Sequence, residues 1–373
     1  MKRRLDQLLV LLFAFGLAFP TLVSLGRSPQ DKRLKEGRVL SSFPEWKDDA
    51  NIWREYRQQW ETYYGDHFGF RASLIAFDLW IKSSLFAETG PNVLAGSGGW
   101  FYLSRDCAVD TVNDCLGLTK IPQRRLKGLQ RRLQERRDWL AAHGIMYLYV
   151  IAPNKETIYP EYLPGWLHPA ATTKIDQFVN QMRWHSTVPV LDLRPALRQA
   201  RLDHWVYYQT DSHWNLWGAF VAGETIIASQ SKRMPGLTPL DPGAFTIQPA
   251  PGLDGDLVRM AGELGVKEAN NPVFIPGPSL PGLEFSSSGT NAVGWPQIWR
   301  IPVAENQEIT TIKNRQRTGR VVIFGDSYAV KLQPFLGYHF GTVILSRAPF
   351  TQDEVLRTQP VLVIDEVVER LLQ

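Results

Sequence analysis

The chain has 373 residues, of which 44% are hydrophobic, so it can bury a large core and does not have the composition of a disordered protein. Its 41 lysines and arginines and 37 acidic residues leave a net charge of +4 that is spread along the chain. The densest basic run, residues 124–137, also contains Gln and Glu at helical spacing, which is typical of a solvated helix face and argues against a nucleic-acid-binding protein.

The first 26 residues predict a membrane anchor. Residues 2–4 are basic, and the run at 8–26 is uncharged, apolar and long enough to cross a bilayer as a helix. Basic residues before such a span favour an N-terminus in the cytoplasm and a remainder outside it. A cleavable signal peptide is the alternative, although the run exceeds a usual signal core and lacks a small-x-small cleavage site. We expect an uncleaved anchor (1–26), a tether (27–42) and a domain (43–373) outside the cytoplasm.

Residues 52–103 are expected to form two helices followed by a β-hairpin. Apolar residues at three- and four-residue spacing over 52–88 predict two helices broken at Gly65 and Gly69. Residues 92–103 alternate around glycines, which predicts a β-hairpin.

From residue 122 onward, amphipathic helices alternate with short apolar strands. A helix at about 122–142 ends before Gly144 and leads into a buried-type strand at 146–152. Further helices are expected at 172–185, 217–230 and 351–357, and further strands at 188–193, 205–209, 321–324, 342–346 and 361–364. This order predicts an α/β fold with a parallel sheet flanked by helices. Residues 235–314 are rich in Pro and Gly, and we interpret them as an insertion with one short helix near 257–264 and an extended pair at 297–314.

The two cysteines, Cys107 and Cys115, lie eight positions apart in a loop-like stretch. An exported chain meets an oxidising compartment, where this pair would form a disulfide. The alternative is two unpaired thiols. Neither cysteine has the histidine neighbours of a metal site, and we expect no metal and no cofactor.

Three predicted strands end on polar residues. These ends carry Asn154-Lys155, Asp211 with His213, and Asp326-Ser327. Catalytic groups of parallel α/β proteins gather at the carboxyl ends of strands.

Ser327, His213 and Asp211 have the residue types of a nucleophilic triad. A serine hydroxyl needs a base to take its proton, and the base needs a third group to fix its tautomer. Asp211 and His213 lie at i and i+2, so in an extended segment they face the same side. The start of the helix after Ser327 would aim backbone N–H groups at a developing oxyanion. The alternative is ordinary turn chemistry, because Asp and Ser are also favoured helix N-caps.

The sequence resembles the alginate O-acetyltransferases of the AlgJ/AlgX type, which belong to the SGNH hydrolase superfamily. The resemblance rests on YYGDHFGFR (63–71), VLAGSGGWFYL (93–103), APNKETIYPEYLP (152–164), TDSHW (210–214), GDLVRMAGELG (255–265), FGDSY (324–328) and VLVIDEVVERLL (361–372). The order Asp, His, Ser along the chain is a mark of this family, since ordinary SGNH esterases have the serine first.

This resemblance implies a function and a set of site residues. Ser327 would be the nucleophile, His213 the general base and Asp211 its orienting acid, with an acetyl group carried on the serine and passed to an exopolysaccharide such as alginate. It also implies that residues 43–373 are an SGNH-like catalytic domain in the periplasm of a bacterium, anchored at the inner membrane. A multi-spanning membrane O-acyltransferase would be the acetyl donor. Tyr328 would line the site, and the alternatives are a carbohydrate acetylesterase and an inert polysaccharide-binding scaffold subunit.

Three further residues are candidates for substrate contact. Asn154 and Lys155 could bind an oxyanion or substrate at their strand end, or could form an ordinary turn with a salt-bridged lysine. Trp214 could stack on a sugar, or pack in the core as most tryptophans do.

Overall fold

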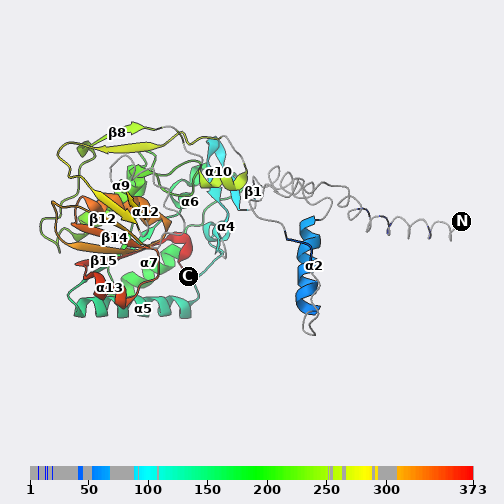
Figure 1. Cartoon of the computed structure of the whole chain (residues 1–373), viewed down its shortest axis with the longest axis horizontal. Coiled ribbons are helices and arrows are strands. Elements are labelled where there is room, and N and C mark those ends of the chain that lie inside the picture. The colour runs from blue at the N-terminus through cyan, green and yellow to red at the C-terminus, as the bar shows by residue number, and fades with distance from the viewer. Residues whose placement is uncertain are drawn as a thin grey trace. The chain divides into compact units, whose positions relative to one another are not determined.

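Figure 1 shows the computed structural model of the chain. It describes residues 41–44, 53–67, 88–90, 92–106, 109–250, 252, 255–262, 266–287, 290–292 and 309–372, together with positions 7, 13, 15 and 19. The chain divides into two compact units, Met1–Thr89 and Gly90–Gln373.

The first unit contains one long described helix, α2 (Trp53–His67). It continues through Gly65, so the break predicted there is wrong; Gly69 and the second predicted helix lie outside the described residues. Apart from three single positions, the apolar run at 8–26 also lies outside them, and the membrane anchor stays a prediction. No helix among the residues that are described combines the length and apolar composition that a bilayer crossing requires.

The second unit is built on a mixed sheet in the order β11-β10-β12-β14-β13-β15-β6-β7. Its parallel half has the strands β14 (Thr342–Ser346), β13 (Arg320–Phe324), β15 (Leu362–Val368), β6 (Met146–Ala152) and β7 (Val190–Asp192). The antiparallel edge has β11 (Thr290–Ala292), β10 (Glu284–Ser287) and β12 (Ile309–Lys313). The parallel sheet is thus confirmed for these five strands, while 205–209 forms no strand and contributes one bridge, between Tyr207 and Trp214.

Helices cover both faces of this sheet (Figure 1). One face carries α5 (Gln123–Ala142), α7 (Lys174–His185) and α13 (Gln352–Thr358), and the other carries α8 (Arg194–Ala200), α9 (Leu216–Gln230) and α12 (Ser327–Gly337). Each strand contributes side chains to the hydrophobic core on both faces of the sheet, because successive side chains of a strand point to opposite faces. In β6, Tyr149 and Ile151 pack on the first side and Leu148 and Val150 on the second.

The predicted insertion is partly built into the fold. Strands β10, β11 and β12 extend the main sheet, whereas β8 (Phe245–Pro249) and β9 (Pro272–Pro276) form a separate pair. The short helix α10 (Asp256–Ala261) packs through Leu257 and Val258 against the hairpin β2 (Val93–Ala95) and β3 (Phe101–Leu103). Residues 235–314, which their composition suggested were a separate insertion, therefore contribute strands to the main sheet and a helix that packs on the β2–β3 hairpin.

The remaining described elements are short. They are the strands β1 (Glu88–Gly90), β4 (Arg105–Asp106) and β5 (Val109–Asp110), the helices α4 (Thr111–Cys115) and α6 (Lys155–Ile158), and the 3-10 turns η2 (Ser97–Gly99), η3 (Pro160–Tyr162), η4 (Pro242–Ala244) and η5 (Glu369–Leu371).

Candidate active site

Ser327 stands at the sharp turn between β13 and α12. Gly325 permits this turn, because a Cβ there would lie 2.7 Å from the Cβ of Ala329 and 3.0 Å from Oε2 of Glu366. Asp326 caps the helix by accepting from the backbone N–H of Tyr328 at 2.9 Å. Its other carboxylate oxygen accepts from the N–H of Val368, the last residue of the neighbouring strand β15, at 2.8 Å. The turn is therefore fixed from its own helix and from β15.

The start of α12 also leaves a backbone donor available. Ser327 is the first residue of the helix, so its N–H has no acceptor one turn earlier. Within the described part of the chain this N–H makes no hydrogen bond. It lies beside the serine hydroxyl, where an oxyanion forms when a serine attacks a carbonyl.

The structure brings the three predicted triad residues into one hydrogen-bonded line. Nε2 of His213 lies 2.7 Å from Oγ of Ser327, and Nδ1 of His213 lies 2.7 Å from Oδ1 of Asp211. With its proton on Nδ1, the ring donates to the carboxylate and accepts from the serine hydroxyl. All three side chains are partly exposed, so the line is open to a reactant.

Asp211 is held as a carboxylate by several donors. It accepts from the backbone N–H of His213 at 2.9 Å and from that of Asp256 at 3.2 Å. Burial acts to raise the pKa of Asp211, but the facing His213, its hydrogen bonds and the charge of Lys331 keep it well below its usual range. Asp211 is therefore ionised at neutral pH and can orient and stabilise the histidine.

Lys155 organises the loop that carries Asp211 and His213. Its buried ammonium donates to the carbonyls of Tyr208 at 3.2 Å, Gln209 at 3.1 Å and Asp211 at 2.8 Å. Burial lowers the pKa of Lys155 to about 8, against the pull of nearby carboxylates such as Asp256. Lys155 is only 2% exposed, so it positions the loop and has almost no surface for a substrate.

The other predicted contact residues are buried as well. Trp214 is fully buried and donates through its indole N–H to the carbonyl of Tyr328 at 3.1 Å. No face of its ring remains for a sugar, and we correct that expectation to packing. Tyr328 is also fully buried; its ring centroid lies 4.9 Å from that of His213, and its hydroxyl donates to the carbonyl of Ser212 at 2.6 Å.

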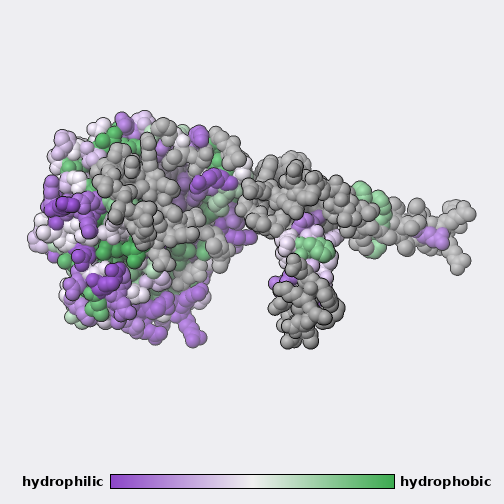
Figure 2. Space-filling view, viewed as in Figure 1, coloured by the Kyte–Doolittle hydropathy of each residue, from purple (hydrophilic) through white to green (hydrophobic). Residues whose placement is uncertain are grey.

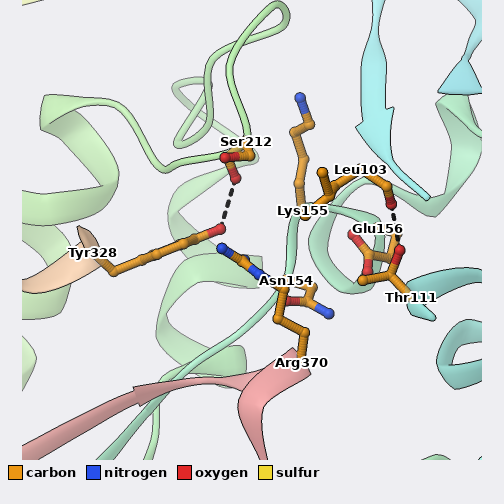
Figure 3. A pocket seen from close by; sticks show the side chains of 8 residues that line it. All are labelled: Leu103, Thr111, Asn154, Lys155, Glu156, Ser212, Tyr328 and Arg370. Carbon is orange, nitrogen blue, oxygen red and sulfur yellow. Dashed lines mark hydrogen bonds between the residues drawn. The ribbon is translucent and has the colours of Figure 1, made fainter. Parts of the chain in front are cut away.

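A cavity of about 10 Å³ lies beside this group, enough for about one water molecule. Figure 3 shows Tyr328 reaching across it to Ser212, with Asn154, Lys155 and Arg370 close by. Oδ1 of Asn154 is buried and has no hydrogen-bond partner among the described residues. The backbone N–H of Asn154 donates to Glu369 at 2.9 Å, which fixes this strand end.

Three buried glutamates lie near the ends of β6 and β15. Burial, with a further contribution from Glu369, raises the pKa of Glu156 to about 7. Burial and the charge of Asp326 raise the pKa of Glu366 well above its usual value, and burial also raises the pKa of Glu369. Sequence reasoning missed these groups, because the apolar pattern of the strands does not show that Glu366 in β15, or Glu156 and Glu369 in the short turns after β6 and β15, are buried.

Asp256 is a further residue at the triad; it belongs to the GDLVRMAGELG motif (255–265), but the sequence alone assigns it no role. It follows His213 by more than 40 positions, in the Pro/Gly-rich segment, and its Oδ2 lies 3.6 Å from Nδ1 of His213. Asp211, His213 and Asp256 offer atoms close enough together to hold a cation. Nδ1 of His213 is already engaged by Asp211, so we assign Asp211 and His213 to the triad, with Asp256 beside them, and not to a metal site.

The predicted disulfide cannot be followed to both partners. Cys115 is buried at the end of α4, and Cys107 lies outside the described residues. The pairing stays a prediction.

Comparison with known proteins finds a similar domain and similar chains. A family model described as the SGNH hydrolase-like domain of acetyltransferase AlgX matches residues 93–276. The protein named Probable alginate O-acetylase AlgJ of Pseudomonas putida is 29% identical over 191 residues, which are 50% of this chain and 45% of that protein. Its namesake in Azotobacter vinelandii is 25% identical over 196 residues, 52% of this chain and 47% of that protein. This chain belongs to the AlgJ/AlgX-like family.

These matches cover only part of each chain. The chain spans about half the length of the curated AlgJ proteins. The AlgX model covers Asp211, His213 and Asp256 but ends before Ser327, so the nucleophile rests on the geometry described above. The fold is also similar to that of PatB1 from Bacillus cereus, with a TM-score of 0.55 at 15% identity over 74% of this chain and 95% of that one.

Proposed function

We propose that this AlgJ/AlgX-like chain is a serine-dependent O-acetyltransferase that acetylates hydroxyl groups of an exopolysaccharide, alginate or a similar polymer. The observation that carries the proposal is the continuous hydrogen-bonded line from Asp211 through His213 to Ser327, with 2.7 Å at each step. The names of the relatives support acetylation of a polysaccharide, and the triad supports an acyl-serine route.

The first half of the reaction loads the serine. Oγ of Ser327 attacks the carbonyl carbon of an acetyl donor while Nε2 of His213 takes the hydroxyl proton. The negative oxygen of the tetrahedral intermediate accepts from the N–H of Ser327. Collapse breaks the bond to the leaving group, which receives the proton from His213, and acetyl-Ser327 remains.

The second half passes the acetyl group to the acceptor. A sugar hydroxyl attacks the ester carbonyl and gives its proton to Nε2 of His213. Collapse of the second intermediate releases the sugar ester, and Oγ of Ser327 takes the proton back. In both halves Asp211 stabilises the imidazolium and holds its tautomer.

The proposed setting comes from the N-terminal sequence and from the family. The basic residues and apolar run at 2–26 support an inner-membrane anchor with the catalytic domain in the periplasm. We further propose a multi-spanning membrane O-acyltransferase as the partner that supplies the acetyl group.

The test is acetate release from a chromogenic acetyl ester by the full-length protein, with and without short uronate or glucan oligomers. Ser327→Ala and His213→Ala should each abolish most release, and mass spectrometry should detect acetyl on one class of oligomer. Serine-dependent release that never reaches a sugar would assign an esterase. Equal inactivity of wild type and both variants would leave an inert scaffold.

A further inference from the structure

The loop that carries Asp211 and His213 is held by a second carboxylate. Asp256 accepts from the backbone N–H of Ser212 at 2.6 Å through Oδ1 and from the Ser212 hydroxyl at 2.5 Å through Oδ2. The same Oδ2 lies 3.6 Å from Nδ1 of His213. One side chain thus braces the loop between the two triad residues and also faces the catalytic ring.

The backbone around Asp256 is built for this approach. A Cβ on Gly255 would lie 2.0 Å from the carbonyl oxygen of Thr210, so only glycine lets the two segments come this close. The N–H of Asp256 donates to Oδ2 of Asp211 at 3.2 Å, and the N–H of Val258 donates to the carbonyl of Thr210 at 3.3 Å. These contacts place Asp256 against the loop independently of its own side-chain hydrogen bonds.

We infer that Asp256 is a positioning residue of the proposed acetyl transfer, acting as a second carboxylate on the Nδ1 side of His213. The inference rests on the proposed function for its kinetic consequence. When His213 takes the proton of Ser327, the new positive charge lies between two carboxylates and not one. Asp256 therefore favours the protonated ring in addition to fixing the loop.

The groups around His213 come from four elements. Asp211 and Ser212 share its loop, Asp256 comes from α10, and Ser327 and Tyr328 come from α12. Two lysines act one step away: Lys331 of α12 on the carboxylate of Asp211, and Lys155 at the start of α6 on the loop carbonyls. The two lysines offset part of the negative charge. At 3.6 Å and with water-like screening, the loss of one carboxylate charge corresponds to about one pH unit in the protonation of the ring.

The decisive variant is Asp256→Asn, because the amide oxygen can still accept from Ser212 while the charge is gone. We expect the half-maximal pH of acetate release to move down by about one unit, with kcat reduced and KM little changed. Asp256→Ala removes the brace as well and should lower kcat further. The control is Asp353→Asn on the exposed first turn of α13, which should leave the profile unchanged.

An NMR titration of the His213 ring in the full-length protein separates this inference from the proposed function. The ring signal, assigned with His213→Ala, should titrate at lower pH in Asp256→Asn than in wild type, whether or not the protein transfers acetyl groups. The same midpoint in both proteins would overturn the inference, even if wild type were active. An inert wild type with the expected shift would refute the acetyl transfer and keep the electrostatic assignment.

Discussion

Glu156→Gln should stabilise the protein above neutral pH and leave its stability unchanged in acid. Glu156 is buried beside the cavity, and its Oε1 has no hydrogen-bond partner among the described residues. Burial and the nearby Glu369 raise its pKa from 4.5 to about 7. The folded state therefore binds a proton that the unfolded chain releases between these values. The stability linked to this proton is complete below pH 4.5 and is lost as pH rises through about 7.

The size of the effect follows from that difference. A shift of one unit corresponds to about 1.4 kcal/mol, so the wild type loses on the order of 3 kcal/mol of unfolding free energy between pH 4.5 and pH 8 through this one group. Glutamine has nearly the same shape and no charge to bury. Its variant should match wild type near pH 5 and exceed it by roughly 2–3 kcal/mol at pH 8.

Urea unfolding at pH 5 and pH 8, followed by tryptophan fluorescence, measures this difference. Glu135→Gln on the exposed side of α5 is the matched control and should differ little from wild type at either pH, because surface ion pairs contribute little. A gain that is equal at both pH values, or absent at pH 8, would refute the assignment of a destabilising buried charge to Glu156.

Two further predictions concern the triad and its loop. Asp211→Asn should lower kcat for acetate release by about 10³–10⁴-fold with the fold retained, because the histidine loses the carboxylate that fixes its tautomer. Circular dichroism checks the fold and the ester assay checks kcat. A rate within tenfold of wild type would contradict this prediction. Lys155→Met should cost about 2–4 kcal/mol of stability, since three loop carbonyls lose their shared donor; urea unfolding measures it, and a stability equal to that of wild type would show that the loop holds itself.

The periodic parts of the fold could be predicted because their signals are local. The strand at 146–152 and the helix at 122–142 follow from runs of apolar residues, and the structure has them at Met146–Ala152 and Gln123–Ala142. The segment 205–209 looks like a strand because its aromatic side chains are apolar. In the structure Val206, Tyr207 and Tyr208 are buried beside the loop that leads to Asp211, whereas Trp205 is exposed, and the backbone of the segment makes only one β-bridge.

The antiparallel edge of the sheet could not be predicted from the composition of its segment. Pro and Gly between residues 235 and 314 indicate turns, and they hide short strands whose partners lie far along the chain. β12 pairs with β14, and no local sequence pattern in either strand indicates this pairing. The same reasoning applies to Asp256, since an acid in a loop-rich stretch is ordinary until the fold places it at His213.

The two halves of the triad are held by separate sets of residues. Lys155 and Asp256 hold the loop of Asp211 and His213, whereas Asp326 ties the turn of Ser327 to β15. The 2.7 Å contact between His213 and Ser327 therefore depends on how these two parts are joined.

Tyr328 makes that connection at the triad. Its hydroxyl donates to the carbonyl of Ser212 in the loop, its own carbonyl accepts from the indole of Trp214, and its ring packs on His213. Tyr328 also follows Ser327 directly in the chain. Its contacts with the loop therefore hold His213 in place right beside the serine hydroxyl that it must contact. The residue beside the nucleophile in the FGDSY motif thus aligns base and nucleophile from within the core, which explains why its aromatic ring is buried and not turned toward a substrate.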